Sequence, residues 1–123
     1  MASITVTGHV IDIRFTTWER IWTGRERFAP PLTSVRHAAR VDNPLRLARG
    51  ARRGYAVSGF AKVGVWGLFG GPRQLVAARR GESGLHLVLD RAAAGGEFDE
   101  VLLSTSAASD LAAAIRRATA AGA

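Results

Sequence analysis

The stretch that decides the fold is LHLVLDRAAAGGEFDEVLLSTSAASDLAAAIRRATA, which spans residues 85–120. Its first five residues place three leucines on one face and His86 and Val88 on the other, as in a half-buried strand. Residues 98–103 read Phe-Asp-Glu-Val-Leu-Leu and predict a second strand. From residue 107 the composition turns to alanine, which predicts a helix to about residue 120. The chain is therefore expected to be rich in strands and to end in a helix.

The terminal helix, expected near residues 107–120, is amphipathic. Residues 104–106 read Ser-Thr-Ser and can cap its start. Asp110 in the first turn and Arg116 and Arg117 in the last would match the helix dipole. Its narrow apolar stripe should close one end of the fold. That stripe consists of Leu111, Ile115 and Ala118.

Upstream, alternation predicts five further strands. A short helix near residues 17–23 is also expected, with Thr17 as its cap and an apolar face that carries Trp18. Glycines at 59 and 64 indicate a bulge or a close backbone approach in one strand. Residues 42–54 lack a period and are predicted to be a loop. The five strands are expected over residues 4–7, 9–15, 32–41, 55–66 and 73–79.

Seven short strands with a single final helix favour an antiparallel sheet, because a parallel sheet needs a crossover between successive strands. The predicted fold is mainly β with a C-terminal helix, either a seven-stranded barrel or a sandwich. No interdomain linker or internal repeat is visible, so residues 1–123 are expected to form one domain.

The chain contains no cysteine, which excludes disulfides, thiolate metal sites and thiol nucleophiles. The first residues lack the basic and apolar regions of a signal peptide. The most apolar stretch, residues 57–71, is interrupted by Lys62 and is too short to span a bilayer. A cytoplasmic location is therefore expected, and peripheral attachment to a membrane is compatible with it.

The charge is distributed unevenly along the chain. Lysine and arginine number 17 against 10 acidic residues, for a net charge of +7, and all but Lys62 are arginines. Residues 20–80 hold thirteen of the basic residues and only two of the acidic ones, Glu26 and Asp42. A GC-rich genome also favours arginine codons, so composition alone does not establish a role for these side chains.

The densest basic segment, residues 36–53, is the candidate site for an anion or a partner. Its arginines could pair with an acidic patch on a partner protein or on another copy of this chain. They could instead contact anionic lipid, or the phosphates of a nucleic acid with Tyr55 or Trp66 stacked on a base. The candidate residues are Arg36, Arg40, Arg46, Arg49, Arg52 and Arg53.

The order of these short motifs resembles that of bacterial pleckstrin-homology-like (PH-like) domain proteins of high-GC bacteria. The motifs are a first hairpin, Trp-Glu-Arg at residues 18–20, Pro-Leu-Thr-Ser-Val at 31–35, Asn-Pro-Leu at 43–45, a glycine-punctuated strand, and an alanine-rich helix after Leu-Leu-Ser. The resemblance covers essentially the whole chain and implies seven strands in two nearly orthogonal sheets, capped by a helix.

The PH-like resemblance implies a binding or scaffolding role and no enzymatic activity. Domains of this kind that bind phosphoinositides carry basic residues in and around the first hairpin loop. Here that loop reads Thr7-Gly8-His9, and only Arg14 lies nearby in the sequence. We therefore expect protein binding or self-association, with anionic lipid or nucleic acid as the alternative and no small-molecule substrate.

No pattern in the sequence predicts catalysis, a cofactor or a metal. His9, His37 and His86 have no paired spacing, and the acidic residues 97–100 are expected to form a solvated rim. The GxxxxG spacing of residues 54–59 lacks the Lys-Ser/Thr that a phosphate-binding loop requires. An enzyme would be indicated only if a histidine met a carboxylate in a deep pocket.

Overall fold

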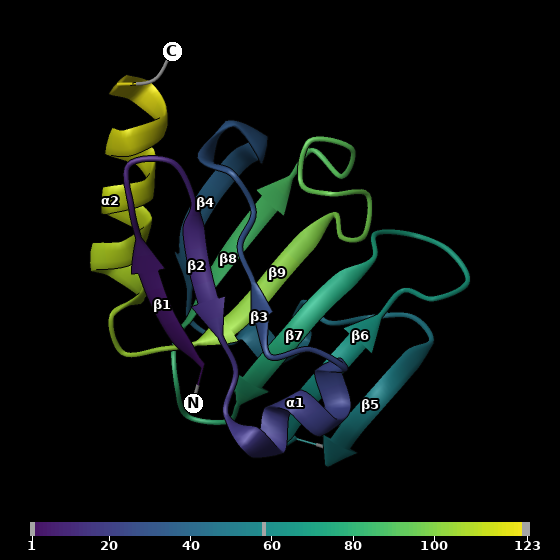
Figure 1. The fold of residues 1–123 in the computed structure, drawn as a ribbon. Coiled ribbons are helices and arrows are strands. Elements are labelled where there is room, and N and C mark those ends of the chain that lie inside the picture. Colours follow the sequence, from purple (N-terminus) through teal and green to yellow (C-terminus); the bar gives the residue numbers. More distant parts are fainter. Residues whose placement is uncertain (1, 58, 122–123) are drawn as a thin grey trace.

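The structure is a computed structural model that describes residues 2–57 and 59–121. It is mainly β, with two sheets and a C-terminal helix (Figure 1). The small sheet, in the order β1-β2-β3, consists of β1 (Ser3–Val6), β2 (Ile11–Arg14) and β3 (Arg27–Phe28). The large sheet, in the order β4-β8-β9-β7-β6-β5, consists of β4 (Val35–Val41), β8 (Gly84–Leu89), β9 (Glu100–Ser104), β7 (Gln74–Arg79), β6 (Ala61–Trp66) and β5 (Arg52–Val57).

The prediction of seven strands in a barrel is wrong, because the described residues form nine strands and no closed barrel. The predicted strand over residues 55–66 is a hairpin, in which Gly59 takes a positive φ of 76° in the turn between β5 and β6. That left-handed conformation suits glycine, which has no Cβ. The other additional strand, β3, is only two residues long and pairs with β2.

The purely antiparallel prediction is also incorrect at one position. β7 and β9 are parallel, with Gln74 beside Glu100 and Ala77 beside Leu103. The chain between them forms β8, which pairs with β4 and β9 on the far side. A strand and its loops therefore provide the crossover that the sequence argument assigned to a helix.

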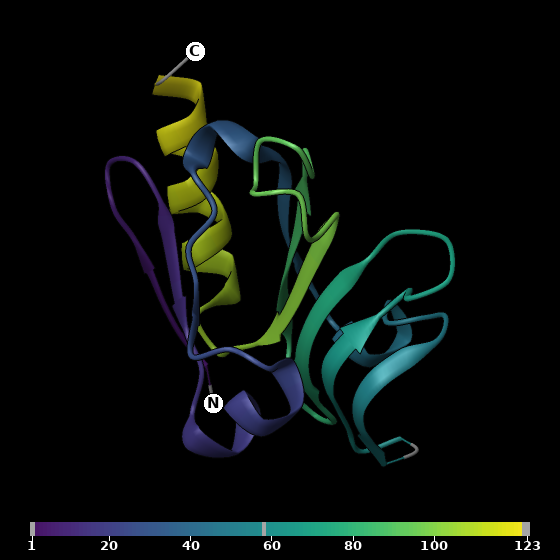
Figure 2. The same ribbon diagram turned by 45° about the vertical axis from the view of Figure 1, so that its right-hand side comes forward.

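The main core lies between the two sheets and is closed on one side by α2 (Ala108–Ala121), as Figure 2 shows. Ile11 and Ile13 of β2 and the three leucines of β8 are fully or almost fully buried, which confirms both alternating patterns. On α2, Ile115 is fully buried and is flanked by the partly buried Leu111 and Ala118, so the predicted stripe is confirmed. The helix continues to Ala121, so Arg116 and Arg117 do not lie in its last turn.

The short helix α1 (Thr17–Thr23) is confirmed, but its orientation differs from the prediction. Thr16, not Thr17, is the cap, and its backbone N–H donates to the Glu19 carboxylate at 2.9 Å in a capping box. This arrangement buries Glu19 and leaves Trp18 and Ile21 exposed. Trp18 packs edge-on against Tyr55 of β5, with ring centroids 5.0 Å apart. The apolar face of α1 is thus only partly covered.

Residues 42–51, here called the strap, connect β4 to β5 and therefore cross from one edge of the large sheet to the other. The strap includes the turn η2 (Pro44–Arg46), and another such turn, η1 (Leu32–Ser34), precedes β4. Leu45 and Ala48 of the strap pack on the outer face of the sheet. They form a second core with Trp66, Val76, Ala78 and Leu102. Both faces of the large sheet are consequently covered.

Candidate functional site

Two polar side chains of the large sheet hold the strap in place. Gln74 is fully buried; its Oε1 accepts from the N–H of Arg49 at 2.9 Å, and its Nε2 donates to the carbonyl of Leu47 at 2.7 Å. Lys62 donates from Nζ to the carbonyls of Leu45 at 2.8 Å and Ala48 at 2.9 Å. The backbone groups of a segment without regular structure are thereby satisfied.

We predict that Gln74→Leu lowers the free energy of unfolding by about 1–3 kcal/mol, because it leaves the strap N–H and C=O without their partner. Urea unfolding checks this value. Hydrogen exchange should accelerate at the amide of Arg49, and the amide of Ile115 in α2 is the internal control. Unchanged stability together with unchanged exchange at Arg49 would contradict the role given to Gln74.

The structure brings one histidine against a carboxylate, which the sequence did not predict. His86 Nε2 lies 2.6 Å from Glu100 Oε1, and Glu100 Oε2 accepts from Gln74 at 3.4 Å. The pair is mostly buried and belongs to the same polar layer that anchors the strap. The pocket beside Glu100 is open to solvent and is also lined by Arg36 and Arg49. Both carboxylate oxygens of Glu100 are occupied, so the geometry favours a structural role for this pair.

The six candidate arginines do not form one cluster. Arg40 and Arg52 lie on β4 and β5, the two opposite edges of the large sheet. Arg36 and Arg49 line the pocket beside Glu100. Arg46 lines a second pocket with Lys62 and Arg80, and Arg53 lines a third with Arg25 and Arg73. The sequence argument missed Lys62, Arg73 and Arg80, although Lys62 was marked by being the one lysine of the chain.

Most acidic side chains are already engaged within the molecule. In the described part of the chain, seven of them lie within ion-pair distance of a basic side chain, and Glu19 caps α1. Arg36 and Arg40 are among the paired arginines, with Asp90 at 3.4 Å and Asp42 at 2.5 Å. The seven paired acids are Asp12, Glu26, Asp42, Asp90, Glu97, Asp99 and Glu100.

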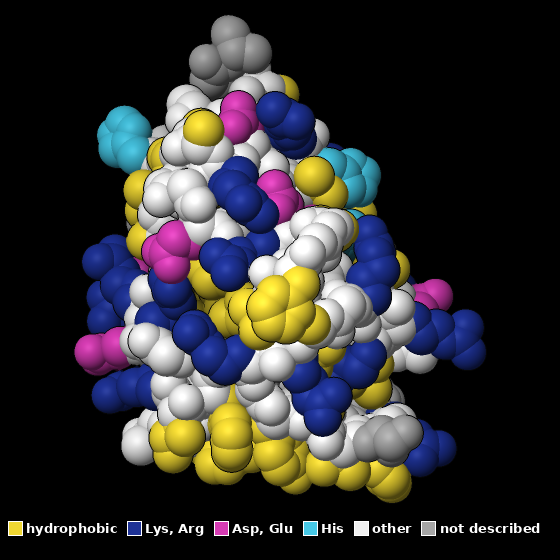
Figure 3. All heavy atoms as spheres, turned by 90° about the vertical axis from the view of Figure 1, so that its right-hand side faces the viewer, with side chains coloured by type: hydrophobic (Ala, Val, Ile, Leu, Met, Phe, Trp, Pro, Cys, Tyr) yellow, Lys and Arg dark blue, Asp and Glu magenta, His cyan; other side chains and the backbone are white. Residues whose placement is uncertain are grey.

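Several arginines have no acidic partner among the described residues. Four of them belong to the candidate set and lie along the strap and at the start of β5; we call them the strap arginines. Figure 3 shows the side of the molecule that carries the β5 edge, where Lys and Arg side chains predominate and apolar side chains form a row along the lower margin. The strap arginines are Arg46, Arg49, Arg52 and Arg53, and all four are exposed.

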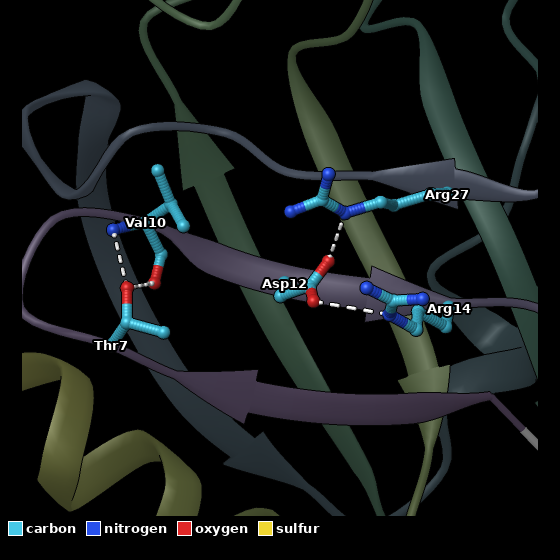
Figure 4. Close-up of polar contacts among 5 residues, drawn as sticks. All are labelled: Thr7, Val10, Asp12, Arg14 and Arg27. Atoms are coloured by element: carbon cyan, nitrogen blue, oxygen red, sulfur yellow. Dashed lines mark hydrogen bonds and ion pairs between the residues drawn. The ribbon is translucent and has the colours of Figure 1, made fainter.

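Asp12 pairs with an arginine on each of two strands of the small sheet, Arg14 on β2 and Arg27 on β3. Asp12 of β2 accepts from Arg14 at 3.2 Å and from Arg27 of β3, as Figure 4 shows. In the turn, the Thr7 hydroxyl accepts from the N–H of Val10 and donates to its carbonyl, each at 3.1 Å. Arg14 and Arg27 are therefore both paired with Asp12.

Three of the paired carboxyls have pKa values below their ordinary range. The Arg27 guanidinium is the main cause at Asp12, and the Arg25 guanidinium lowers the pKa of Glu97. Burial alone would raise the pKa of Asp99, but the N–H of Arg73 and the Arg91 guanidinium outweigh it and lower the value. The ionised forms of these groups are therefore favoured by folding.

A lowered pKa in the folded state gives stability that is present above the unfolded value and is lost in acid. The ordinary values are 4.5 for Glu97 and 3.8 for Asp99. We predict that the free energy of unfolding falls as the pH drops below about 4.5. In the double variant Glu97→Gln/Asp99→Asn this acid-induced loss of stability should be smaller, by about 0.5 kcal/mol for each ion pair removed. Urea titrations at several pH values measure it, and parallel pH profiles would contradict the assignment.

Neither stacking residue proposed from the sequence is free to accept a base. Trp66 is only 3% exposed and lies beneath the strap, and Tyr55 packs against Trp18 and Trp22. In the described part of the chain, no three His, Asp or Glu side chains gather as a metal site would require. None of the described helices combines the length and the apolar character needed to cross a membrane.

Comparison with known protein families, curated proteins and solved structures finds no significant match to this chain.

Proposed function

We propose that this chain is a non-enzymatic interaction module whose strap arginines bind an acidic segment of a partner protein. The observation that carries the proposal is the difference within the candidate set: Arg36 and Arg40 are paired with acids, whereas the strap arginines have no acidic partner among the described residues. A free guanidinium can take a carboxylate in a two-point hydrogen bond without first breaking an existing pair.

Another copy of this chain is a weaker partner for these arginines. Seven of its acids are already paired within the molecule, so few carboxylates remain for a charge-driven contact between copies. Nucleic acid is also less favoured, because Trp66 is buried and Tyr55 packs in an aromatic cluster. An acidic protein segment needs neither feature.

The non-enzymatic part of the proposal is supported by the surroundings of His86. Its carboxylate partner Glu100 also accepts from Gln74, whose other bonds hold the strap. A general base must accept a proton from a bound group, and both carboxylate oxygens of Glu100 are already engaged by His86 and Gln74. The pair instead serves as a support for the segment that carries Arg49.

The test is binding of a fluorescent oligoglutamate peptide to the whole protein, followed by anisotropy at increasing salt. We expect saturable binding at low ionic strength that weakens as salt screens the charges. A mixed-sequence oligonucleotide and vesicles with phosphatidylserine provide the competing arms at the same salt. No peptide binding at low salt, or binding to DNA or vesicles alone, would overturn the proposal.

A second candidate, self-association, is favoured by the outer edge of β5, which pairs with no strand on its outer side among the described residues. β5 is the last strand of the large sheet, and the exposed Val57 and Phe60 lie at its end. An exposed edge strand can pair with the same strand of a second copy. Light scattering over a range of concentrations and salt should then show a dimer, whereas a monomer under all conditions would exclude it.

We also propose that the chain is a PH-like domain, as the order of its sequence motifs indicates. Two sheets and a C-terminal helix support it at the level of architecture. A nearly orthogonal packing of the two sheets is proposed with it. A peripheral position at the membrane belongs to the alternative in which the candidate arginines bind anionic lipid.

A further inference from the structure

A pocket of about 540 Å³ opens between the strap and the turns that follow β5 and β7. Three cations from separate elements line it: Arg46 of η2, Lys62 of β6 and Arg80 after β7. Among the described residues that line it, the one acid is Asp42, whose carboxylate is already held by Arg40 at 2.5 Å. The pocket therefore has an excess of positive charge that its own lining does not neutralise.

Lys62 is poised to accept one more partner. Two of its ammonium protons are directed to the carbonyls of Leu45 and Ala48, which leaves the third for a ligand. Burial lowers the pKa of Lys62, and the nearby Arg52 guanidinium lowers it further. A bound anion would offset both effects by favouring the charged ammonium.

Arg80 is fixed by an aromatic ring rather than by an acid. Its guanidinium lies over the ring of Phe60, 5.3 Å from the centroid, and its backbone N–H donates to the Phe60 carbonyl at 2.7 Å. No acidic partner of Arg80 is present among the described residues. Phe60 is 57% exposed, so the cationic pocket has an open apolar neighbour.

We propose that this pocket binds a phosphate monoester, with its phosphoryl oxygens among Arg46, Lys62 and Arg80. Like a phosphorylated side chain, a phosphate monoester carries a charge of about −1.5 to −2 at neutral pH. It therefore matches a site of several cations better than a singly charged diester does. An apolar or aromatic substituent on the phosphate would lie beside Phe60. This site shares Arg46 with the acidic-segment surface but goes beyond that surface, since Lys62 and Arg80 take no part in it.

The same chemistry is available from a free phosphate monoester or from the headgroup of phosphatidic acid. Phenyl phosphate tests the first source, through amide chemical-shift changes in a two-dimensional NMR titration. Phosphatidylcholine vesicles with phosphatidic acid test the second by co-sedimentation, and vesicles of equal charge made with phosphatidylglycerol, a diester, are their control.

Arg80→Gln is the main variant, because it removes a charge without touching the strap. Lys62→Met is a second variant, used only if its NMR spectrum shows a folded protein. Each of these two variants should weaken the affinity for the phosphate probe about tenfold, which corresponds to the loss of one charge-assisted hydrogen bond. Arg117→Gln, an exposed position on α2, removes the same charge elsewhere and should have little effect.

The proposal is supported if phenyl phosphate shifts amides around the pocket, or if phosphatidic acid vesicles bind, and Arg80→Gln weakens that binding more than Arg117→Gln. It is overturned if neither probe binds, if the shifts lie elsewhere, or if the two variants have equal effects. Loss of oligoglutamate binding with phenyl phosphate binding intact would contradict only the acidic-partner function.

Discussion

Phe98→Ala is expected to lower the free energy of unfolding by about 3–5 kcal/mol. Phe98 lies in the loop before β9 and is 2% exposed in the core between the sheets. Its ring packs edge-on against Phe28 of β3, with centroids 5.3 Å apart and an interplanar angle of 81°. Truncation leaves a cavity where the two-residue strand β3 meets the core, and it removes the ring beneath the Arg25 guanidinium.

Phe69→Ala is the matched control, because Phe69 is 91% exposed in the loop between β6 and β7. The same substitution should there change the unfolding free energy by less than about 0.5 kcal/mol. Urea unfolding of both variants gives the comparison. Equal effects at the two positions would contradict the core that the structure places between its sheets.

Gly67→Ala is expected to cost about 3 kcal/mol or more. Gly67 has a φ of 76°, which places a side chain in the left-handed region at about 1–2 kcal/mol. An added Cβ would also lie 2.0 Å from the carbonyl oxygen of Pro72. Because that oxygen belongs to the backbone, the loop between β6 and β7 must shift, at a further cost of about 1–3 kcal/mol.

Gly59→Ala separates the two contributions at Gly67. Gly59 also has a φ of 76°, but apart from its own chain neighbours no described residue places an atom within 4 Å of an added Cβ. Its replacement should cost only about 1–2 kcal/mol, through the backbone conformation. Thermal or urea unfolding decides the matter, and equal losses for the two variants would show that the contact with Pro72 contributes nothing.

The elements predicted correctly are those in which apolar residues recur at a regular spacing within the element itself. β2, β8 and α2 each place one face on the core, so alternation or a helical stripe was enough to find them. The sequence predicts one strand over residues 55–66 because the end of β5, residues 55–57, is apolar like β6, and only the turn at Gly59 separates them. A strand over residues 55–66 would exceed the usual length of 3–10 residues, and that signal could have divided it.

The loop predicted over residues 42–54 is confirmed for residues 42–51, whereas residues 52–54 belong to β5. The anchoring of the strap on the sheet was not predicted, because the strap is held by residues distant in the sequence. Its anchor Gln74 follows Arg49 by 25 positions, and nothing near either one indicates the contact. A signal was present on the sheet beneath it: residues 75–78 are apolar without interruption, which is typical of a strand buried on both faces. Such a run implies a cover on the outer face.

The candidate arginines were visible in the sequence, but their pairing was not. Arg36 meets Asp90 and Arg25 meets Glu97 across long stretches of chain. A count of charges along the sequence does not distinguish these paired arginines from Arg49, which has no acidic partner among the described residues. The pocket of Arg46, Lys62 and Arg80 likewise depends on the course of the strap over the sheet.

The central claim is that the unpaired strap arginines, rather than the overall positive charge, bind an acidic partner. Arg49→Gln/Arg53→Gln and Arg36→Gln/Arg40→Gln each remove two positive charges, the first pair unpaired and the second ion-paired. The decisive measurement is the affinity of both double variants for oligoglutamate at low salt. The account predicts a loss of about tenfold or more for the first and a much smaller loss for the second. Equal losses would contradict it.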